Sequence, residues 1–455
     1  MSSKQAEKSD RKVARGDRVE KGGRKVAKGE SVVLDGARKV VLENGLRLIT
    51  EHIPSVRSIS VGFWILGGSQ VEKVEESGIT HFIEHMLFKG TPTRTAYDIA
   101  KDMDSLGGHL DAFTSREYTC LLATVMDDHL SKVIDILTDQ LKNSLFDEQE
   151  IDRERDVILE EIKMIEDSPD ELVHDLGIEN LWPGQPLGRS IIGCRESVQR
   201  FTRKDLFGYF EQNYVPEEII ITAAGNVCHD SLLDMIQKRN LSATVSSRKK
   251  VDNMDRPTAH HQITYVSKKL EQVHVCLALD GLPQNHSLRF ASYLMNSILG
   301  GGMSSRLFQK IREQRGLAYS VYSSFHSYQD AGFVSIYAGV RPKSFHDTIQ
   351  LILEELTTFK EQEVTAEELQ RAKDQLKGSL MLGLESTANR MSKLARQEIY
   401  FKENLSINQL LTKIDAVTQE DILSLARLLF RTENVSLTVL GDISGQKLTL
   451  EDLRC

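Results

Sequence analysis

The sequence predicts an α+β protein of two homologous domains, each a mostly antiparallel sheet with helices packed on one face. Two observations support this prediction. The chain repeats one pattern of helix and strand in its second half, and within the first half short apolar strand patterns precede long amphipathic helix patterns. The chain has 455 residues, of which 40% are hydrophobic, and this is enough apolar material for two separate cores.

The repeated unit starts with a helix-capping threonine, continues as an amphipathic helix, and ends as an apolar strand that finishes in glycine. It occupies residues 202–225 and again residues 418–441, an offset of 216 positions. A second pair of helical segments begins at Phe146 and at Val364, an offset of 218 positions. Because two distant pairs share nearly the same offset, we interpret the chain as two homologous halves.

Composition predicts the domain boundaries. Residues 1–34 are rich in Lys, Arg, Gly and Ser and are predicted to be a disordered basic tail. The first domain is expected over 35–243, a polar linker over 244–259, and the second domain over 260–455.

The elements of the first half follow from local patterns. Two apolar runs flank Asn44-Gly45 and predict a hairpin. The run SISVGFWI predicts a buried strand, residues 107–125 predict two more strands, and helices are expected from Leu130 onward.

Bulk properties exclude several classes of protein. No apolar run approaches the roughly 18–20 residues of a membrane span, so none is expected. The net charge of −9 disfavours a nucleic-acid partner. Five scattered cysteines without a CxxC pair argue against a disulfide scaffold and against a thiolate zinc site. The tail fits a bacterial cytoplasmic protein better than one of the mitochondrial matrix, which is the alternative location.

The pentad HFIEH is the first chemically specific motif. On a helix, His81 and His85 lie one turn apart on the same face, and Glu84 is adjacent to them. Two imidazoles at this spacing can bind one Zn²⁺, and a glutamate beside them can act as a general base. The order H-x-x-E-H is the inverzincin signature. The alternative is an ordinary surface helix rich in His and Glu.

A third ligand is expected on a later helix. Glu154 and Glu161 are seven residues apart, two turns along one helix face, and Glu161 follows His85 by 76 residues. With this spacing the sequence resembles the pitrilysin/insulinase family of zinc peptidases. The resemblance implies Glu161 as the third zinc ligand, one zinc per chain, and Glu154 as the family's second, catalytically assisting glutamate. Without the histidines, both glutamates would be read as a solvated helix face.

The second half carries no such pentad, and at the repeat offset Ser379 stands where the first half has Glu161. There the resemblance implies that Arg312 and Tyr319 face the substrate and stabilise the oxyanion; an exposed Arg and a packed Tyr are the alternative. In the first half it implies that Asp111, Ala112 and Phe113 form an edge strand that pairs with an extended peptide. The family usually has Asn where this chain has Asp111.

These expectations combine into a zinc-dependent endopeptidase that cleaves unfolded or presequence-like peptides in a clamshell chamber. In this mechanism Glu84 takes the proton of a zinc-bound water and delivers it to the leaving amine. The resemblance implies a homodimer, or a heterodimer with a related subunit. The alternative function is a non-catalytic structural or peptide-holding subunit of a processing-peptidase-like assembly.

Overall fold

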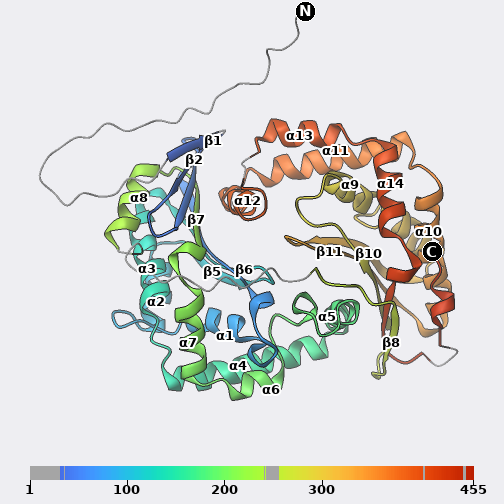
Figure 1. Cartoon of the computed structure of the whole chain (residues 1–455), viewed down its shortest axis with the longest axis horizontal. Helices are drawn as coiled ribbons and strands as arrows, with labels where there is room; N and C mark the ends of the chain where they lie inside the picture. Colours follow the sequence, from blue (N-terminus) through green and yellow to red (C-terminus); the bar gives the residue numbers. More distant parts are fainter. Residues whose placement is uncertain (1–30, 35, 240, 242–255, 403–404, 444–446) are drawn as a thin grey trace, which may run out of the picture.

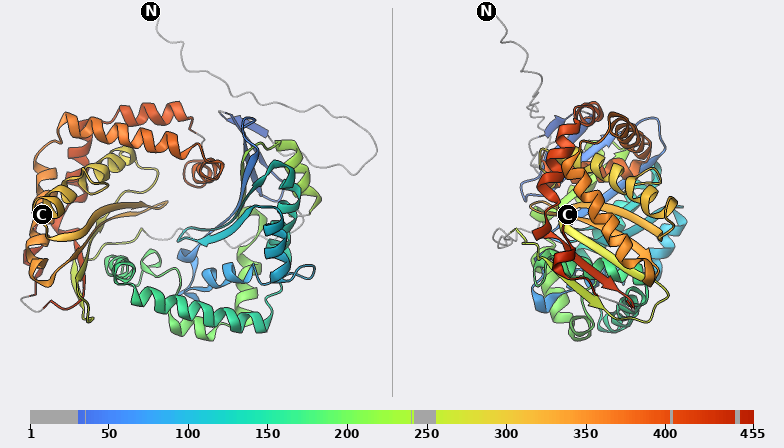
Figure 2. Two further views of the ribbon diagram at one scale, coloured as in Figure 1. Left: turned by 180° about the vertical axis from the view of Figure 1, so that it is seen from behind. Right: turned by 90° about the vertical axis from the view of Figure 1, so that its right-hand side faces the viewer.

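The computed structural model describes residues 31–34, 36–239, 241, 256–402, 405–443 and 447–455. These residues form two α+β halves, each with one sheet. Figure 1 shows the two sheets facing the middle of the molecule, with α2, α3 and α8 outside the first and α9, α10 and α14 outside the second. The view from behind in Figure 2 shows the same arrangement.

Strands of half one pair in the order β1-β2-β3-β7-β4-β6-β5, and those of half two in the order β10-β11-β9-β12-β8. The strands of half one are β1 Ser31–Leu34, β2 Ala37–Val41, β3 Arg47–His52, β4 Ser58–Leu66, β5 His109–Thr114, β6 Tyr118–Met126 and β7 Ile219–Gly225. Those of half two are β8 Gln262–Val266, β9 Val273–Asp280, β10 Ala318–Ser327, β11 Gly332–Val340 and β12 Ser436–Leu440.

The two sheets share one topology, which explains the repeat seen in the sequence. The order β3-β7-β4-β6-β5 in half one matches β8-β12-β9-β11-β10 in half two. In both sheets the first pair, β3 with β7 and β8 with β12, is parallel, and the other pairs are antiparallel. Strands β5 and β10 are therefore equivalent, and each lies at a sheet edge.

Helices of half one are α1 Ile79–Met86, α2 Ala96–Ser105, α3 Leu130–Asn143, α4 Glu148–Asp167, α5 Pro169–Leu181, α6 Arg195–Arg200, α7 Arg203–Asn213 and α8 His229–Lys238. Helices of half two are α9 Arg289–Leu299, α10 Phe345–Glu361, α11 Ala366–Gly383, α12 Thr387–Tyr400, α13 Ile407–Asp415 and α14 Gln419–Leu429, with a π-helical turn at Phe308–Glu313. Helices α4 and α11 are the two long segments whose similarity indicated the repeat.

One helix of each half packs on the sheet of the other half. Helix α12 packs on β3, β4 and β7, where Met391 and Leu394 join a buried cluster with Trp64. Reciprocally, α5 packs on β9 and β12, where Val173 is buried beside Cys276. The inner face of each sheet is thus covered by the other half, while its own helices pack on the outer face.

The predicted hairpin is confirmed, because β2 and β3 pair antiparallel around Asn44-Gly45. Ser31–Leu34, which the sequence assigned to the tail, instead pairs with β2 as β1; its sequence SVVL is apolar and β-branched, which suits a strand. Residues 1–30 and most of the predicted linker lie outside the described residues. Within the described chain, no helix is long and apolar enough to cross a membrane.

Candidate metal centre

Helix α1 is held at its N-terminus by a carboxylate from outside the helix. Its N-cap residue, Gly78, has a φ of 90° and no capping side chain, and an added Cβ would lie 2.6 Å from the Ile192 carbonyl oxygen. Instead, the buried Glu72 accepts hydrogen bonds from the backbone N–H groups of Gly78 and Thr80, both at 2.9 Å. These bonds satisfy N–H groups that a helix start leaves unpaired, and they fix the direction of α1.

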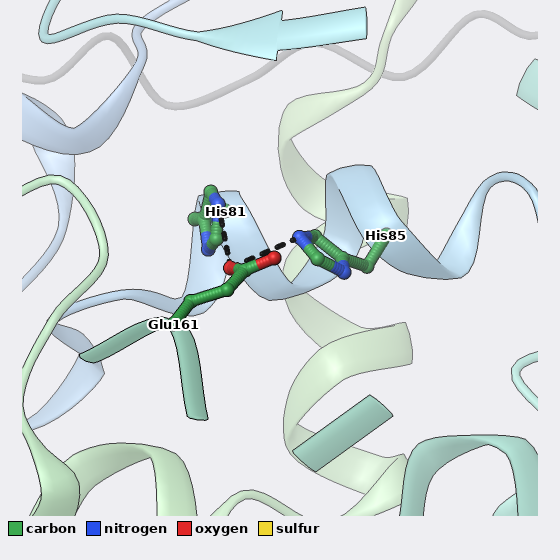
Figure 3. Close-up of side chains that lie close together, drawn as sticks. All are labelled: His81, His85 and Glu161. Carbon is green, nitrogen blue, oxygen red and sulfur yellow. Dashed lines mark ion pairs between the residues drawn. The ribbon is translucent and has the colours of Figure 1, made fainter. Parts of the chain in front are cut away.

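His81, His85 and Glu161 converge on one point between α1 and α4 (Figure 3). Glu161 Oε2 lies 3.8 Å from His81 Nε2 and 3.6 Å from His85 Nε2. The imidazole centroids are 4.7 Å apart, and one potential ligand atom from each of the three residues lies within 4.8 Å of the others. This is the only such group of three or more potential ligands found among the described residues.

The arrangement fits a tetrahedral zinc ion. Bonds of about 2.0–2.2 Å to nitrogen and oxygen separate two ligand atoms of a tetrahedral zinc by about 3.3–3.6 Å. The observed 3.6 and 3.8 Å between carboxylate and imidazole atoms are close to that spacing. Two imidazoles and one carboxylate also leave a fourth position for water, as catalytic zinc sites do.

Glu154 supports His85 from the side away from the convergence point. Its Oε2 lies 3.0 Å from His85 Nδ1, and its Oε1 lies 2.5 Å from Lys89 Nζ. Burial alone would lower the pKa of His85, but the surrounding carboxylates, first of all Glu154, raise it overall. A proton held on Nδ1 by Glu154 leaves the Nε2 lone pair directed at a metal.

His81 has a different environment from His85. Burial, reinforced by the neighbouring His85, lowers the pKa of His81 to about 3. Its Nδ1 is buried and has no hydrogen-bond partner among the described residues. The ring is therefore neutral at neutral pH, the state in which imidazole binds a metal.

Glu84 lies beside the two histidines and contacts the edge strand. The Thr114 hydroxyl, on β5, donates a hydrogen bond of 2.5 Å to Glu84 Oε2. Burial raises the pKa of Glu84 above its ordinary value, although the Thr114 bond and the nearby His85 act in the opposite direction. A carboxyl with a raised pKa beside a metal site is suited to exchanging protons near neutral pH.

The strand with Asp111, Ala112 and Phe113 is β5, the last strand of its sheet. One of its edges pairs with β6, and the other has no strand partner in the described structure. Asp111 and Phe113 are exposed, and Phe113 makes edge contacts with the rings of Trp64 and Tyr118. The position next to Glu84 agrees with the expected edge strand.

Arg312 and Tyr319 lie together in half two, away from the three potential ligands. The Arg312 guanidinium stacks over the Tyr319 ring, 4.9 Å from its centroid, and Tyr319 is 76% exposed at the start of β10. Among the described residues, no ion pair or hydrogen bond joins either side chain to α1 or α4. The chain therefore brings His81, Glu84, His85, Glu154 and Glu161 together but not these two.

Comparison with known proteins places the chain in a family. Residues 47–195 match the family "Insulinase (Peptidase family M16)", and residues 200–376 match "Peptidase M16 inactive domain". An uncharacterized zinc protease of Bacillus subtilis is 40% identical over 404 residues, covering 89% of this chain and 98% of that protein. One from Mycobacterium tuberculosis is 38% identical over 420 residues, covering 92% and 96%.

Two solved structures have the same fold. A protease from Helicobacter pylori superposes with a TM-score of 0.84 at 22% identity, covering 90% of this chain and all of that one. A Pseudomonas fluorescens structure described as a peptidase M16 inactive domain gives 0.83 at 19% identity, covering 90% and 99%. The chain thus belongs to the insulinase (M16) family of peptidases, in its short two-domain form.

Sequence reasoning missed Glu72 and Thr114 as parts of this centre. Glu72 stands in an acidic run with Glu75 and Glu76, and nothing in the run distinguishes the one that turns inward. Thr114 is an alternate residue of an edge strand, and its contact with Glu84 depends on how β5 passes α1. Neither contact has a spacing signal in the sequence.

Proposed function

We propose that this chain is a zinc-dependent endopeptidase whose catalytic site is built by the first domain. The convergence of His81, His85 and Glu161 beside Glu84 is the observation that carries the proposal. The zinc-protease names of its relatives support zinc as the metal. The one group of three potential ligands among the described residues supports one ion per chain. The bacterial sources of these relatives support the bacterial cytoplasm over the mitochondrial matrix.

In this proposal His81, His85 and Glu161 hold the zinc. When bound, zinc would act as a Lewis acid, which lowers the pKa of a water molecule and polarises a peptide carbonyl. Glu84 accepts the proton of the attacking water and transfers it to the leaving amine, and Thr114 holds its carboxylate in place. Glu154 is a positioning residue, because it contacts His85 and not the reacting atoms.

The substrate in this proposal is an unfolded or presequence-like peptide bound in extended form. Asp111, Ala112 and Phe113 would pair with it, because the outer edge of β5 offers backbone groups without a strand partner in the described structure. Asp111 is exposed on this strand and would favour peptides with basic residues.

The experiment that tests the proposal compares zinc-loaded wild type with Glu84→Gln on a quenched basic peptide of about 15–20 residues. We expect both proteins to bind about one zinc per chain, and only the wild type to cut. Glu160→Gln is the matched control, because Glu160 lies on α4 next to Glu161 but is exposed and pairs with Lys163. A wild type that binds zinc yet stays inert would favour the structural or peptide-holding role instead.

We also propose that two chains close as a clamshell, so that the second domain, residues 260–455, brings Arg312 and Tyr319 to the partner's zinc. Among the described residues, no ion pair or hydrogen bond joins them to α1 or α4 of their own chain, which supports an action in the dimer. If so, mixing the inactive variants Glu84→Gln and Arg312→Ala should restore activity, to about a quarter of the wild-type sites for random dimers. No recovery from two separately inactive proteins would rule out this arrangement of the site.

A further inference from the structure

Half two contains a cavity of about 470 Å³ between α9, the end of α11 and α12. Its volume is within the usual range for small-ligand sites, about 300–1,000 Å³. Its wall combines aromatic rings, such as Phe290, Tyr293 and Phe401, with the basic side chains Arg289, Lys393 and Arg396. Among the described lining residues there is no Asp or Glu, although the protein as a whole has a net charge of −9.

The cavity lies at the counterpart of the metal centre. Helices α9 and α11 pack together in half two as α1 and α4 do in half one. Ser379, which stands 218 positions after the ligand Glu161, is one of the lining residues. Half two has thus kept the pair of helices and opened a cavity lined by cations where half one has a carboxylate that binds a cation.

Arg289 is the central cation of the cavity. Its guanidinium lies 4.1 Å from the ring centroid of Phe401 and 4.8 Å from that of Phe290. Neither Arg289 nor Arg396 makes an ion pair or a hydrogen bond with any residue that the structure describes. The nearby Asp421 is engaged elsewhere, since it accepts hydrogen bonds from the N–H and hydroxyl groups of Thr418.

Among the described residues, no carboxylate of the cavity wall pairs with Arg289. Arg289 is half-buried, and desolvation lowers its pKa below the usual value. It also occupies the first turn of α9, where the helix dipole favours a negative charge and disfavours a positive one. A partly desolvated cation without a partner is costly, and a carboxylate placed against the planar guanidinium would offset that cost with two parallel hydrogen bonds.

Tyr293 marks where such a carboxylate would sit. Its buried phenol interacts electrostatically with both Arg289 and Arg396, so the two cations approach the same ring. The phenol hydroxyl itself donates a 3.4 Å hydrogen bond to Gln284 Oε1. Two guanidinium groups near one ring form a receptor for a carboxylate, and the aromatic walls suit an apolar group attached to it.

We propose that this cavity binds an organic carboxylate with an apolar body, as the free C-terminal residue of a peptide presents. The assignment to peptides rests on the proposed function, whereas carboxylate binding does not. The cavity is connected to the edge strand, because the lining residue Tyr400 donates a 2.6 Å hydrogen bond to Glu117 in the β5–β6 turn. A peptide whose C-terminus occupies the cavity therefore lies beside β5.

The test uses zinc-free full-length protein, so that no carboxylate can bind through the metal. Isothermal titration calorimetry measures the binding of N-acetyl-phenylalanine and, as the uncharged control, of N-acetyl-phenylalaninamide. We expect the acid to bind the wild type with a Kd below about 1 mM and the amide at least tenfold more weakly. Arg289→Gln should weaken binding of the acid about 10- to 100-fold. Arg341→Gln, at an exposed arginine of the same half, should leave that affinity unchanged.

Two further arms keep the outcomes distinct. Arg289→Lys keeps the positive charge but loses the planar guanidinium with its two parallel N–H donors. Affinity for the acid between those of the wild type and Arg289→Gln, in a protein with the wild-type melting temperature, shows that the guanidinium itself is used. Equal binding of acid and amide, or no effect of Arg289→Gln, would overturn the proposal. With zinc-loaded enzyme, a free C-terminus should lower the KM of a peptide relative to its amide; failure of this arm alone would reject the peptide assignment and keep the carboxylate site.

Discussion

Glu154→Gln tests whether the zinc affinity depends on a charge that does not itself bind the metal. The substitution keeps the shape of the side chain and an oxygen that can accept from His85 Nδ1, at present 3.0 Å away. It replaces a charge-assisted hydrogen bond with a neutral one, and it removes the ion pair with Lys89.

The expected loss is 10- to 100-fold in zinc affinity, or about 1.4–2.8 kcal/mol, the usual effect of removing a carboxylate behind a ligating histidine. The free energy of unfolding of the zinc-free protein should fall much less. The Lys89 side chain is 27% exposed, so water can take over most of the lost partner, and we expect about 1 kcal/mol or less.

Competition with a chelator of known zinc affinity at pH 7.5 measures the first quantity, and thermal unfolding of the zinc-free protein measures the second. Glu160→Gln, six positions further along α4 and exposed, is the control for losing one negative charge from the helix. The reasoning is refuted if Glu154→Gln binds zinc within about twofold of the wild type, because the contact with His85 would then contribute nothing to ligation.

Three more predictions follow from other contacts. Burial raises the pKa of Glu72 to about 7. Its protonated form is thus favoured by folding, and this stabilisation is complete below its unfolded pKa and lost as pH rises through about 7. Urea unfolding should therefore show that the free energy of unfolding of the wild type falls by up to about 3 kcal/mol between pH 4.5 and 7 relative to that of Glu72→Gln. Parallel pH dependences of this free energy in the two proteins would contradict the prediction. Gly177→Ala should destabilise the protein by about 1–3 kcal/mol in thermal unfolding, because the new Cβ would lie 2.6 Å from the Cys276 sulfur in the other half. Gly208→Ala is the control: Gly208 is also helical but has open space beside it, so the change should be neutral or stabilising. Thr114→Val removes a bond that lowers the pKa of Glu84, so the acid limb of the kcat/KM–pH profile should move to higher pH; an unmoved limb would show that Glu84 is not the titrating base.

Local signals in the sequence predicted much of this fold. The Asn44-Gly45 turn, the apolar run of β4 and the capping threonines of α7 and α14 act within a few residues, so their patterns are visible in one sequence. The candidate metal centre contains a local signal of the same kind, since helix geometry fixes the relation of His81 to His85. Glu161 required a family spacing, because only the packing of α4 against α1 brings it there.

Long-range packing was not predictable in this way. The exchange of α5 and α12 between the halves depends on surfaces that lie far apart in the chain, as Val173 and Cys276 do. Helix α12 alone has an ordinary amphipathic pattern and α5 has hardly any, so neither pattern indicates which sheet the helix packs on. The interior role of Glu72 is similar, because an inward carboxylate is recognised only when its hydrogen-bond donors are known. The sequence specifies these contacts through the shape of the folded halves and not through any spacing.

The exchange of helices gives half two a structural role, although its described residues contain no candidate metal centre. Helix α12 of half two covers Trp64 and the inner face of the sheet whose edge is β5, and Thr114 on β5 holds Glu84. Without α12, the buried cluster around Trp64, whose ring contacts Phe113 of β5, would be open to water. Half two thus supports the sheet that carries β5, the strand beside the candidate metal centre of half one. Substitutions in α12 that loosen this contact, far from any ligand, should lower activity by displacing β5 while leaving the three ligands in place.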